Sequence, residues 1–241
     1  LDYTETEVEK EGFNVTVEAQ DLCPRYIAHY VYDVKLGQSP AWMRRRLALV
    51  GNNSISNIVD ITNYIMRELG QPLHAFDCDY LEGNAINVRR AAEGEKIVTL
   101  DEKEFTLNPN NLVICDGKKP VALAGIMGGL NSEIRDTTTE VMFEAAKFAR
   151  DNIRRSSRAL GQGSDASQRY SKGVDEYTTE MAMKRVLHLV EELGVGKISK
   201  THKNVNTGNS LEPTTFKTSV KKVNAVLGIT VPNEDILRIL T

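Results

Sequence analysis

The chain has 241 residues, of which 41% are hydrophobic and 26% are charged, and its formal net charge is -3. These values are typical of a folded globular protein and give room for one large domain, or for one domain and part of another. A mildly acidic total argues against a module that binds nucleic acid through bulk charge. Local basic clusters remain at Arg44–Arg46 and at Arg154, Arg155 and Arg158, although such clusters on helices are usually solvated faces.

Other whole-chain features exclude further classes. The sequence has no apolar run long enough to cross a membrane, starts at Leu1 and carries no signal peptide, so we expect a cytoplasmic segment of a longer protein with no membrane partner. Three widely spaced cysteines, Cys23, Cys78 and Cys115, predict free thiols in a reducing compartment. The four histidines are scattered, so we expect no metal site.

The first third of the chain predicts an arm, a strand and two helices. Residues 1–21 are polar and weakly patterned, which favours a linker or arm, and the segment RYIAHYVYDVKLG that begins at Arg25 alternates like a strand. Ser39 as N-cap and Pro40 at the first position predict a helix over 40–50.

The second helix, predicted over 58–69, precedes an unusual turn. Apolar residues recur at spacings of three and four on one face, Gly70 ends the helix, and Pro72 prevents its continuation. His74 follows this Gln-Pro turn at once. Asn63 points roughly away from the apolar face, and Thr62 lies at its edge, so polar side chains occur near the turn.

The remaining text alternates between strands, helices and a linker. Residues 85–125 are rich in strand signals, Glu144 stands alone among apolar neighbours in VMFEAAKFA, and a helix is predicted over 175–194. Residues 197–213 are interpreted as a linker. Residues 214–241, with Ser219 as a helix cap, are too few to bury a core and are interpreted as the start of another domain.

Each candidate functional residue has a structural alternative when it is taken alone. A single histidine such as His74 is most often a half-buried structural residue, and Glu144 can be a salt-bridged acid, although an acid among apolar residues needs a partner or a purpose. The glycines of LAGIMGG match no dinucleotide or phosphate-loop motif and favour a sharp turn or close backbone packing. No nucleophile elbow or paired-carboxylate motif is present.

Several long motifs change this weighing. From Leu22 to about Gly194 the chain resembles the editing module of the β chain of bacterial phenylalanyl-tRNA synthetase, through LCPRY, SPAWMRRRL, NIVDITNYIMRELGQPLHAFD, NVRRA, LAGIMGG, FEAAKF and SDASQRYSKGVD, in that order. The resemblance covers about seven-tenths of the chain, and it implies an editing domain over 22–196. The segment 214–241 resembles the truncated start of the next, winged-helix-like domain.

The resemblance implies a fold and a set of partners. The fold is α+β, with a mixed, curved or barrel-like sheet flanked by helices. The implied substrate is tRNA(Phe) carrying a mischarged tyrosine at its 3′ end, and the implied partner is the synthetase α chain in an α2β2 assembly. The resemblance assigns no cofactor to this segment, and ATP and Mg²⁺ to the parent ligase.

The resemblance also implies the residues of an editing site. His74, Asn63 and Thr62 would act on the ester, with His74 positioning water or the ester end and the other two orienting the aminoacyl group or the ribose. Glu144 would accept a hydrogen bond from the tyrosyl phenol. Gly125 would let the substrate approach the backbone, and the wall would be formed by Ser164 and Ala166.

Two departures and two alternatives accompany this hypothesis. Ser164 stands where the family commonly has Thr, and Gln168 stands where His is frequent, so pocket size is left open. The module could instead be a non-catalytic element that binds tRNA or packs against the α chain, and in that case residues 62, 63, 74 and 144 would not converge. A freestanding relative with another substrate is a third possibility, against which the segment 214–241 weighs.

Overall fold

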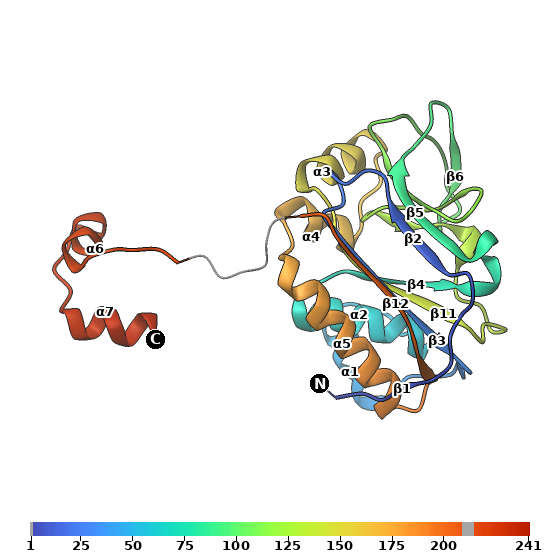
Figure 1. Ribbon diagram of the computed structural model, residues 1–241, viewed down its shortest axis with the longest axis horizontal. Coiled ribbons are helices and arrows are strands. Elements are labelled where there is room, and N and C mark those ends of the chain that lie inside the picture. The colour runs from blue at the N-terminus through green and yellow to red at the C-terminus, as the bar shows by residue number, and fades with distance from the viewer. Residues whose placement is uncertain (1, 209–214) are drawn as a thin grey trace. The chain divides into compact units, whose positions relative to one another are not determined.

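The computed structural model describes residues 2–208 and 215–241 (Figure 1). Contacts between residues divide the chain near residue 209 into two compact units, which are described separately. The larger unit contains two five-stranded sheets, and the predicted site lies within it.

The first sheet has the strand order β1-β12-β3-β11-β4. All neighbours are antiparallel except β1 and β12, which pair in parallel. The strands are β1 (Glu5–Thr6), β12 (Lys197–Asn206), β3 (Arg25–Tyr32), β11 (Val141–Lys147) and β4 (Leu73–Asp77). Every residue of β11 except Lys147 is buried, because both faces of the sheet are covered.

One face of this sheet packs against three helices, α1 (Ala41–Leu49), α2 (Asn57–Leu69) and α5 (Glu176–Glu192) (Figure 1). Side chains of a strand alternate between its two faces. Val141, Phe143 and Ala145 of β11 therefore join the helix-side core, whereas Met142 and Ala146 join the opposite core. Glu144 shares the face of these last two residues and so points away from the helices.

The opposite face packs against the second sheet, of order β10-β9-β8-β5-β2. Its strands are β10 (Met127–Gly128), β9 (Pro120–Leu123), β8 (Leu112–Cys115), β5 (Ala85–Arg90) and β2 (Asn14–Val17). A two-stranded ribbon, β6 (Lys96–Val98) and β7 (Glu104–Thr106), the helices α3 (Arg150–Ala159) and α4 (Asp165–Lys172), and the short helices η1 (Cys78–Tyr80), η2 (Glu82–Asn84) and η3 (Leu130–Ser132) complete the unit. The second core lies between the two sheets, and this is where the cavity forms.

The turn between α2 and β4 is held by buried polar contacts. Ser56 caps α2 by accepting a hydrogen bond from Val59 N, and Gly70 ends the helix in the left-handed region with φ of 76°. Gln71 is fully buried, and its side-chain amide donates to the carbonyls of Pro72 at 2.9 Å and Ala146 at 2.8 Å. The bond to Ala146 ties the turn to β11, so β4, with His74 as its second residue, starts from a fixed position.

The α+β class is confirmed, and the helices agree with the expected ranges over 40–50, 58–69 and 175–194. The barrel-like alternative is wrong, because within the described residues neither five-stranded sheet closes on itself, and β1 and β4 are the open edges of the first sheet.

Two segments interpreted as linkers contain strands. Within residues 1–21, β1 and β2 each pair with a sheet, and residues 197–206 of the expected linker 197–213 form β12, next to β3. Ile198 and Ser199 are the buried positions of β12, so its side chains give no apolar period, and backbone pairing determines its structure. Residues 209–213 of that expected linker lie outside the described residues.

The second unit is a pair of short helices, α6 (Val220–Leu227) and α7 (Asn233–Leu240). Ser219 caps α6, as expected, by accepting a hydrogen bond from Lys222 N at 3.2 Å. The apolar side chains of this second unit are mostly exposed. The interpretation of the unit as the start of a winged-helix-like domain stays a prediction. Among the described residues, the longest apolar stretches of helix are too short or too polar to cross a bilayer.

Candidate functional site

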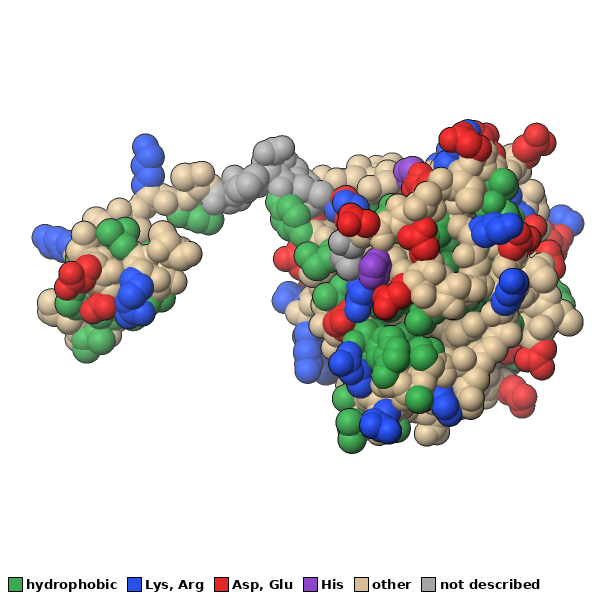
Figure 2. Space-filling model, turned by 90° about the horizontal axis from the view of Figure 1, so that it is seen from below, with side chains coloured by type: hydrophobic (Ala, Val, Ile, Leu, Met, Phe, Trp, Pro, Cys, Tyr) green, Lys and Arg blue, Asp and Glu red, His purple; other side chains and the backbone are tan. Residues whose placement is uncertain are grey.

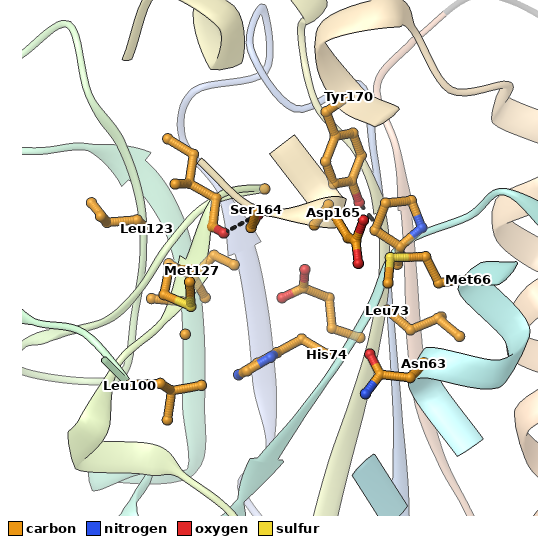
Figure 3. Close-up of a pocket in the computed structure, with 18 residues that line it drawn as sticks. Asn63, Met66, Leu73, His74, Leu100, Leu123, Met127, Ser164, Asp165 and Tyr170 are labelled. Atoms are coloured by element: carbon orange, nitrogen blue, oxygen red, sulfur yellow. Dashed lines mark hydrogen bonds between the residues drawn. The ribbon is translucent and has the colours of Figure 1, made fainter. Parts of the chain in front are cut away.

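A cavity of about 210 Å³ lies between the two sheets of the larger unit. Its walls come from α2, from the Gln-Pro turn and β4, from the segment 122–128, from β11 and from the start of α4 (Figure 3). Six of the seven residues named as site residues line it: Asn63, His74, Gly125, Glu144, Ser164 and Ala166. Segments far apart in the sequence thus bring most of the expected set together.

Glu144 and His74 stand directly opposite each other on neighbouring strands. They are paired in register between β11 and β4, so both side chains project from the same face of the sheet. Glu144 is 5% exposed, and its carboxylate accepts a hydrogen bond from the Tyr26 hydroxyl at 2.8 Å.

The environment of Glu144 changes its acidity. Burial raises the pKa of this carboxyl to about 7, and the hydrogen bond donated by Tyr26 opposes that rise. Tyr26 engages Oε2 of the carboxyl. Oε1 therefore remains as an acceptor for a ligand hydroxyl in the cavity.

His74 presents a neutral imidazole with an unused nitrogen. Burial lowers its pKa to about 4, so the ring is uncharged at neutral pH. Its Nε2 is buried and has no hydrogen-bond partner among the described residues, while the ring packs edge-on against Phe76 with centroids 4.5 Å apart. Such a nitrogen can bond a water molecule or a ligand.

Gly128 makes room for this ring. A Cβ at that position would lie 2.5 Å from His74 Cε1 and 3.0 Å from Leu100 Cδ1, both on residues that line the cavity. Gly128 is therefore a site residue that the sequence analysis did not name, although the motif LAGIMGG contains it.

The two polar residues of α2 have different positions. Asn63 is half-buried and its amide lies at the cavity (Figure 3). Thr62 does not line the cavity, and its hydroxyl donates to the carbonyl of Val59 at 2.7 Å within the helix. Successive residues of a helix point about 100° apart, so only one of the pair can face the cavity.

Gly125 is explained by its backbone and its packing. Its φ is 66°, and an added Cβ would lie 2.9 Å from Tyr170 Cδ2 and 3.0 Å from Phe148 Cδ2. The space that its missing side chain leaves is filled by these rings. Packing is therefore one reason for a glycine at this position, and its role in substrate approach stays a prediction.

Ser164 and Ala166 belong to the start of α4. Ser164 caps the helix, accepts a hydrogen bond from Ser167 N at 3.1 Å, and donates to the carbonyl of Ile126 at 2.6 Å. Its hydroxyl thus fixes α4 against the segment that ends at Gly128. Gln168 is exposed on α4 and does not line the cavity.

Three further residues of the site escaped the sequence analysis. Tyr26 supports Glu144, Tyr170 donates to the carbonyl of Ala146 at 2.9 Å, and Asp165 pairs with Arg67 at 2.5 Å across the cavity rim. Tyr170 and Asp165 stand inside the motif SDASQRYSKGVD, so that motif was a usable signal. Tyr26 lies beside Glu144 only through the register of β3 and β11, which the sequence does not reveal.

Potential metal ligands gather elsewhere. Among the described residues, Glu5, His29 and His202 place one ligand atom each within 4.8 Å of one another, and none of the three lines the cavity. His29 already donates from Nε2 to the Ser199 carbonyl at 2.8 Å. The candidate site residues of the cavity are therefore separate from this cluster.

Comparisons with known proteins show the family of the chain. Residues 22–195 match the model of the B3/4 domain family. The chain is 48% identical over 232 residues to the phenylalanine–tRNA ligase β subunit of Syntrophus aciditrophicus, which covers 94% of the chain and 28% of that relative. It is 46% identical to the β subunit of Geobacter metallireducens, covering 91% of the chain and 27% of the relative, and 43% identical to that of Clostridium acetobutylicum, covering 98% and 30%.

A solved structure shares the fold. An N-terminal fragment of the phenylalanyl-tRNA synthetase β subunit from Pyrococcus horikoshii superposes with a TM-score of 0.55 at 13% identity, covering 100% of this chain and 66% of that one. The chain spans about three-tenths of the length of the curated relatives. The resemblance to phenylalanyl-tRNA synthetase β chains is thereby confirmed, and the chain belongs to the B3/4 domain family.

Proposed function

We propose that this chain carries the editing site of a phenylalanine–tRNA ligase β subunit, and that it hydrolyses tyrosine esterified to tRNA(Phe). The observation that carries the proposal is the pairing of a buried, Tyr26-supported Glu144 with His74 in one cavity. Residues 63, 74 and 144 meet there, whereas the scaffolding alternative expected them to lie apart. That convergence favours editing.

The need for such a site follows from the chemistry of the two amino acids. Tyrosine is phenylalanine with one added hydroxyl, and a hydrophobic pocket rejects an added hydroxyl only by a factor of about 100. A site that hydrogen-bonds the hydroxyl discriminates by roughly ten-thousand-fold, because the smaller substrate leaves buried polar groups unpaired. Glu144 supplies that polar group.

The phenol of a bound tyrosyl group would donate to Glu144 Oε1, while Tyr26 continues to donate to Oε2. The carboxyl would then have a donor on each oxygen. A phenylalanyl group offers no donor, so it would leave a buried carboxyl half-satisfied and bind weakly. The selectivity is thus for tyrosine and against the correct product.

Hydrolysis requires water to attack the ester carbonyl and the ribose oxygen to leave. The neutral His74, whose Nε2 has no partner among the described residues, would hold that water or the ester, and Asn63 at the cavity would orient the aminoacyl group or the terminal ribose. An ester is reactive enough for positioning to account for much of the rate, and a ribose hydroxyl of the tRNA can assist. Ser164 and Ala166 would shape the wall around the ring, beside the turn that contains Gly125.

The proposal includes the partners of the parent enzyme. The α chain would hold the aminoacylation site with ATP and Mg²⁺, and this chain would use no cofactor of its own for editing. The assembly would act in the cytoplasm. Because other domains of the β chain contact tRNA, we expect weak or undetectable hydrolysis by this chain alone.

The test is deacylation of preformed Tyr-tRNA(Phe) by the assembled synthetase, with the wild type compared with Glu144→Ala and His74→Ala. Both variants should clear the ester about 100-fold more slowly, or slower still. Glu140→Ala is the matched control, because this carboxyl precedes β11 and pairs with Lys10 outside the cavity. Wild-type rates in both site variants would overturn the proposal.

A further inference from the structure

A groove of about 330 Å³ lies on the surface of α3 and α4, outside the cavity. These helices lie side by side at one end of the larger unit (Figure 1). Eight residues line the groove, namely Arg154, Ser157, Arg158, Gly163, Ser167, Gln168, Ser171 and Lys172. Its polar surface consists of three cations, three hydroxyls and one amide, and the set contains no carboxylate.

The two helices differ in charge from the rest of the chain. Together α3 and α4 contain six Arg or Lys residues and two Asp, a net charge of +4, whereas the whole chain has a net charge of -3. On the face of the larger unit in Figure 2, acidic and basic side chains are interspersed instead. The positive charge is therefore concentrated on one part of the surface.

The cations of this groove are available to a partner. Arg154 makes an exposed ion pair with Asp151 at 3.2 Å, while Arg158 and Lys172 are exposed and make no ion pair with any described residue. The other basic cluster of the sequence is used differently. Arg46 donates to the Tyr64 hydroxyl at 2.6 Å and lies over the Trp42 ring, so this exposed guanidinium is engaged by neighbouring side chains.

The groove and the cavity are two sides of one helix. Ser164–Ala166 and Tyr170 line the cavity, whereas the groove is lined from α4 by Ser167, Gln168, Ser171 and Lys172. Arginine, lysine and serine hydroxyls are the side chains that contact the phosphates of nucleic acids. The phosphates of an RNA whose last nucleotide enters the cavity therefore have a chemically suited surface on the same helix.

We infer that the α3–α4 groove binds the phosphate backbone of the single-stranded RNA end whose terminal ester occupies the cavity. Arg158 and Lys172 neutralise phosphates, and Ser171 adds a hydrogen bond, whereas the buried Ser167 hydroxyl is used in the cap of α4. The inference rests on the proposed function, because that function identifies the bound RNA as the 3′ end of tRNA(Phe). It assigns the groove a positioning role that none of the cavity residues supplies.

The test uses the 241-residue chain and a fluorescent single-stranded RNA of about 12 nucleotides, whose free 3′ end carries no aminoacyl group. Binding is measured by anisotropy between about 50 and 200 mM salt. The double variant Arg158→Ala/Lys172→Ala should bind about tenfold more weakly, and its slope of log K against log salt should be smaller by about 1.4, since each phosphate contact contributes about 0.7.

The matched control is Lys96→Ala/Lys118→Ala, which removes the same charge from exposed sites outside the groove. Equal losses in both double variants, or no RNA binding by the wild type, would overturn the inference. An oligoglutamate peptide of the same charge that displaces the RNA equally well would overturn the assignment to nucleic acid.

The outcome is separable from that of the proposed function. The RNA probe carries no aminoacyl group, so its binding does not depend on recognition of the tyrosyl phenol, and Glu140→Ala, which lies outside the cavity and the groove, should bind it as the wild type does. In the assembled synthetase, the groove variant should raise KM for Tyr-tRNA(Phe) and leave kcat unchanged. A fall in kcat with no change in KM would contradict the positioning role even if editing itself is confirmed.

Discussion

One face of the first sheet carries the buried His29 and the other carries the half-buried His74, and the contrast between them supports the proposed site. Burial lowers the pKa of both His29 and His74 to about 4. His29 lies on β3, donates from Nε2 to the Ser199 carbonyl at 2.8 Å and stacks on His202. His74 lies opposite Glu144, and its Nε2 has no partner among the described residues.

Burial and acidity alone therefore do not distinguish a functional imidazole from a structural one. A buried polar atom without a hydrogen bond lowers stability by about 1–3 kcal/mol. Such an atom is expected where a ligand or water completes the bond. In this sheet the unpaired nitrogen stands beside the cavity and the paired one does not.

The largest expected effect comes from removing each imidazole in turn. In the assembled synthetase, His74→Ala should lower the kcat of Tyr-tRNA(Phe) hydrolysis about 100-fold. His29→Ala should leave kcat within about twofold and lower the free energy of unfolding by about 1–3 kcal/mol, because it strands the Ser199 carbonyl. Deacylation assays and urea unfolding of both variants measure this, and the reverse pattern would refute the contrast between the two faces.

Gly128→Ala should have the next largest effect. The added methyl would meet the His74 ring at 2.5 Å, so the imidazole must move and hydrolysis should slow about tenfold. Gly37→Ala is the control, since a Cβ at that position meets nothing within 4 Å. If Gly128→Ala hydrolyses the ester at the control's rate, then His74 does not need its observed position.

Tyr26→Phe should alter the pH dependence of hydrolysis. The donated hydrogen bond holds the pKa of Glu144 down, so its removal should shift the rise in kcat/KM with pH from about 7 to higher pH. Tyr170→Phe is the comparison, because the Tyr170 hydroxyl bonds the Ala146 carbonyl and not a carboxyl. Equal midpoints in the wild type and Tyr26→Phe would exclude Tyr26 as the support of Glu144.

The smallest expected effect is on the pH dependence of the free energy of unfolding. Because the pKa of Glu144 is raised from 4.5 to about 7 in the folded protein, its contribution to stability is complete below pH 4.5 and is lost as the pH rises through 7. Glu144→Gln removes this dependence, so between about pH 6 and pH 7 the variant should gain about 1 kcal/mol relative to the wild type. Urea unfolding of the chain at the two pH values tests this, and a constant difference would show that Glu144 is not buried as described.

The sequence was informative where local rules and structure coincide. The caps and the apolar stripe of α2 and the Gln-Pro turn are local signals. Most of the candidate site residues that the family motifs indicated line one cavity. Contacts that depend on the register between strands could not be predicted from the sequence. Tyr26 meets Glu144, and β12 joins β3, through pairings between distant segments that leave no periodic pattern.

Two expected site residues, Thr62 and Gly125, have contacts that the sequence did not predict, and the cause is the same. Thr62 shares a motif with Asn63, but the rotation of the helix turns its hydroxyl to the Val59 carbonyl. Gly125 was expected to admit substrate, yet the rings of Tyr170 and Phe148 occupy the space beside it, and Gly128 is the glycine against the imidazole. Motifs identify which residues belong to a site, and packing decides what each of them does.

The central claim is that a buried carboxyl recognises the tyrosyl phenol. Its most direct test is a crystal structure of the chain with a non-hydrolysable tyrosyl-adenosine analogue. We predict the phenol oxygen at about 2.7 Å from Glu144 Oε1, with the aminoacyl linkage near His74 and Asn63. A phenol that points to solvent, or a ring bound away from Glu144, would contradict the account.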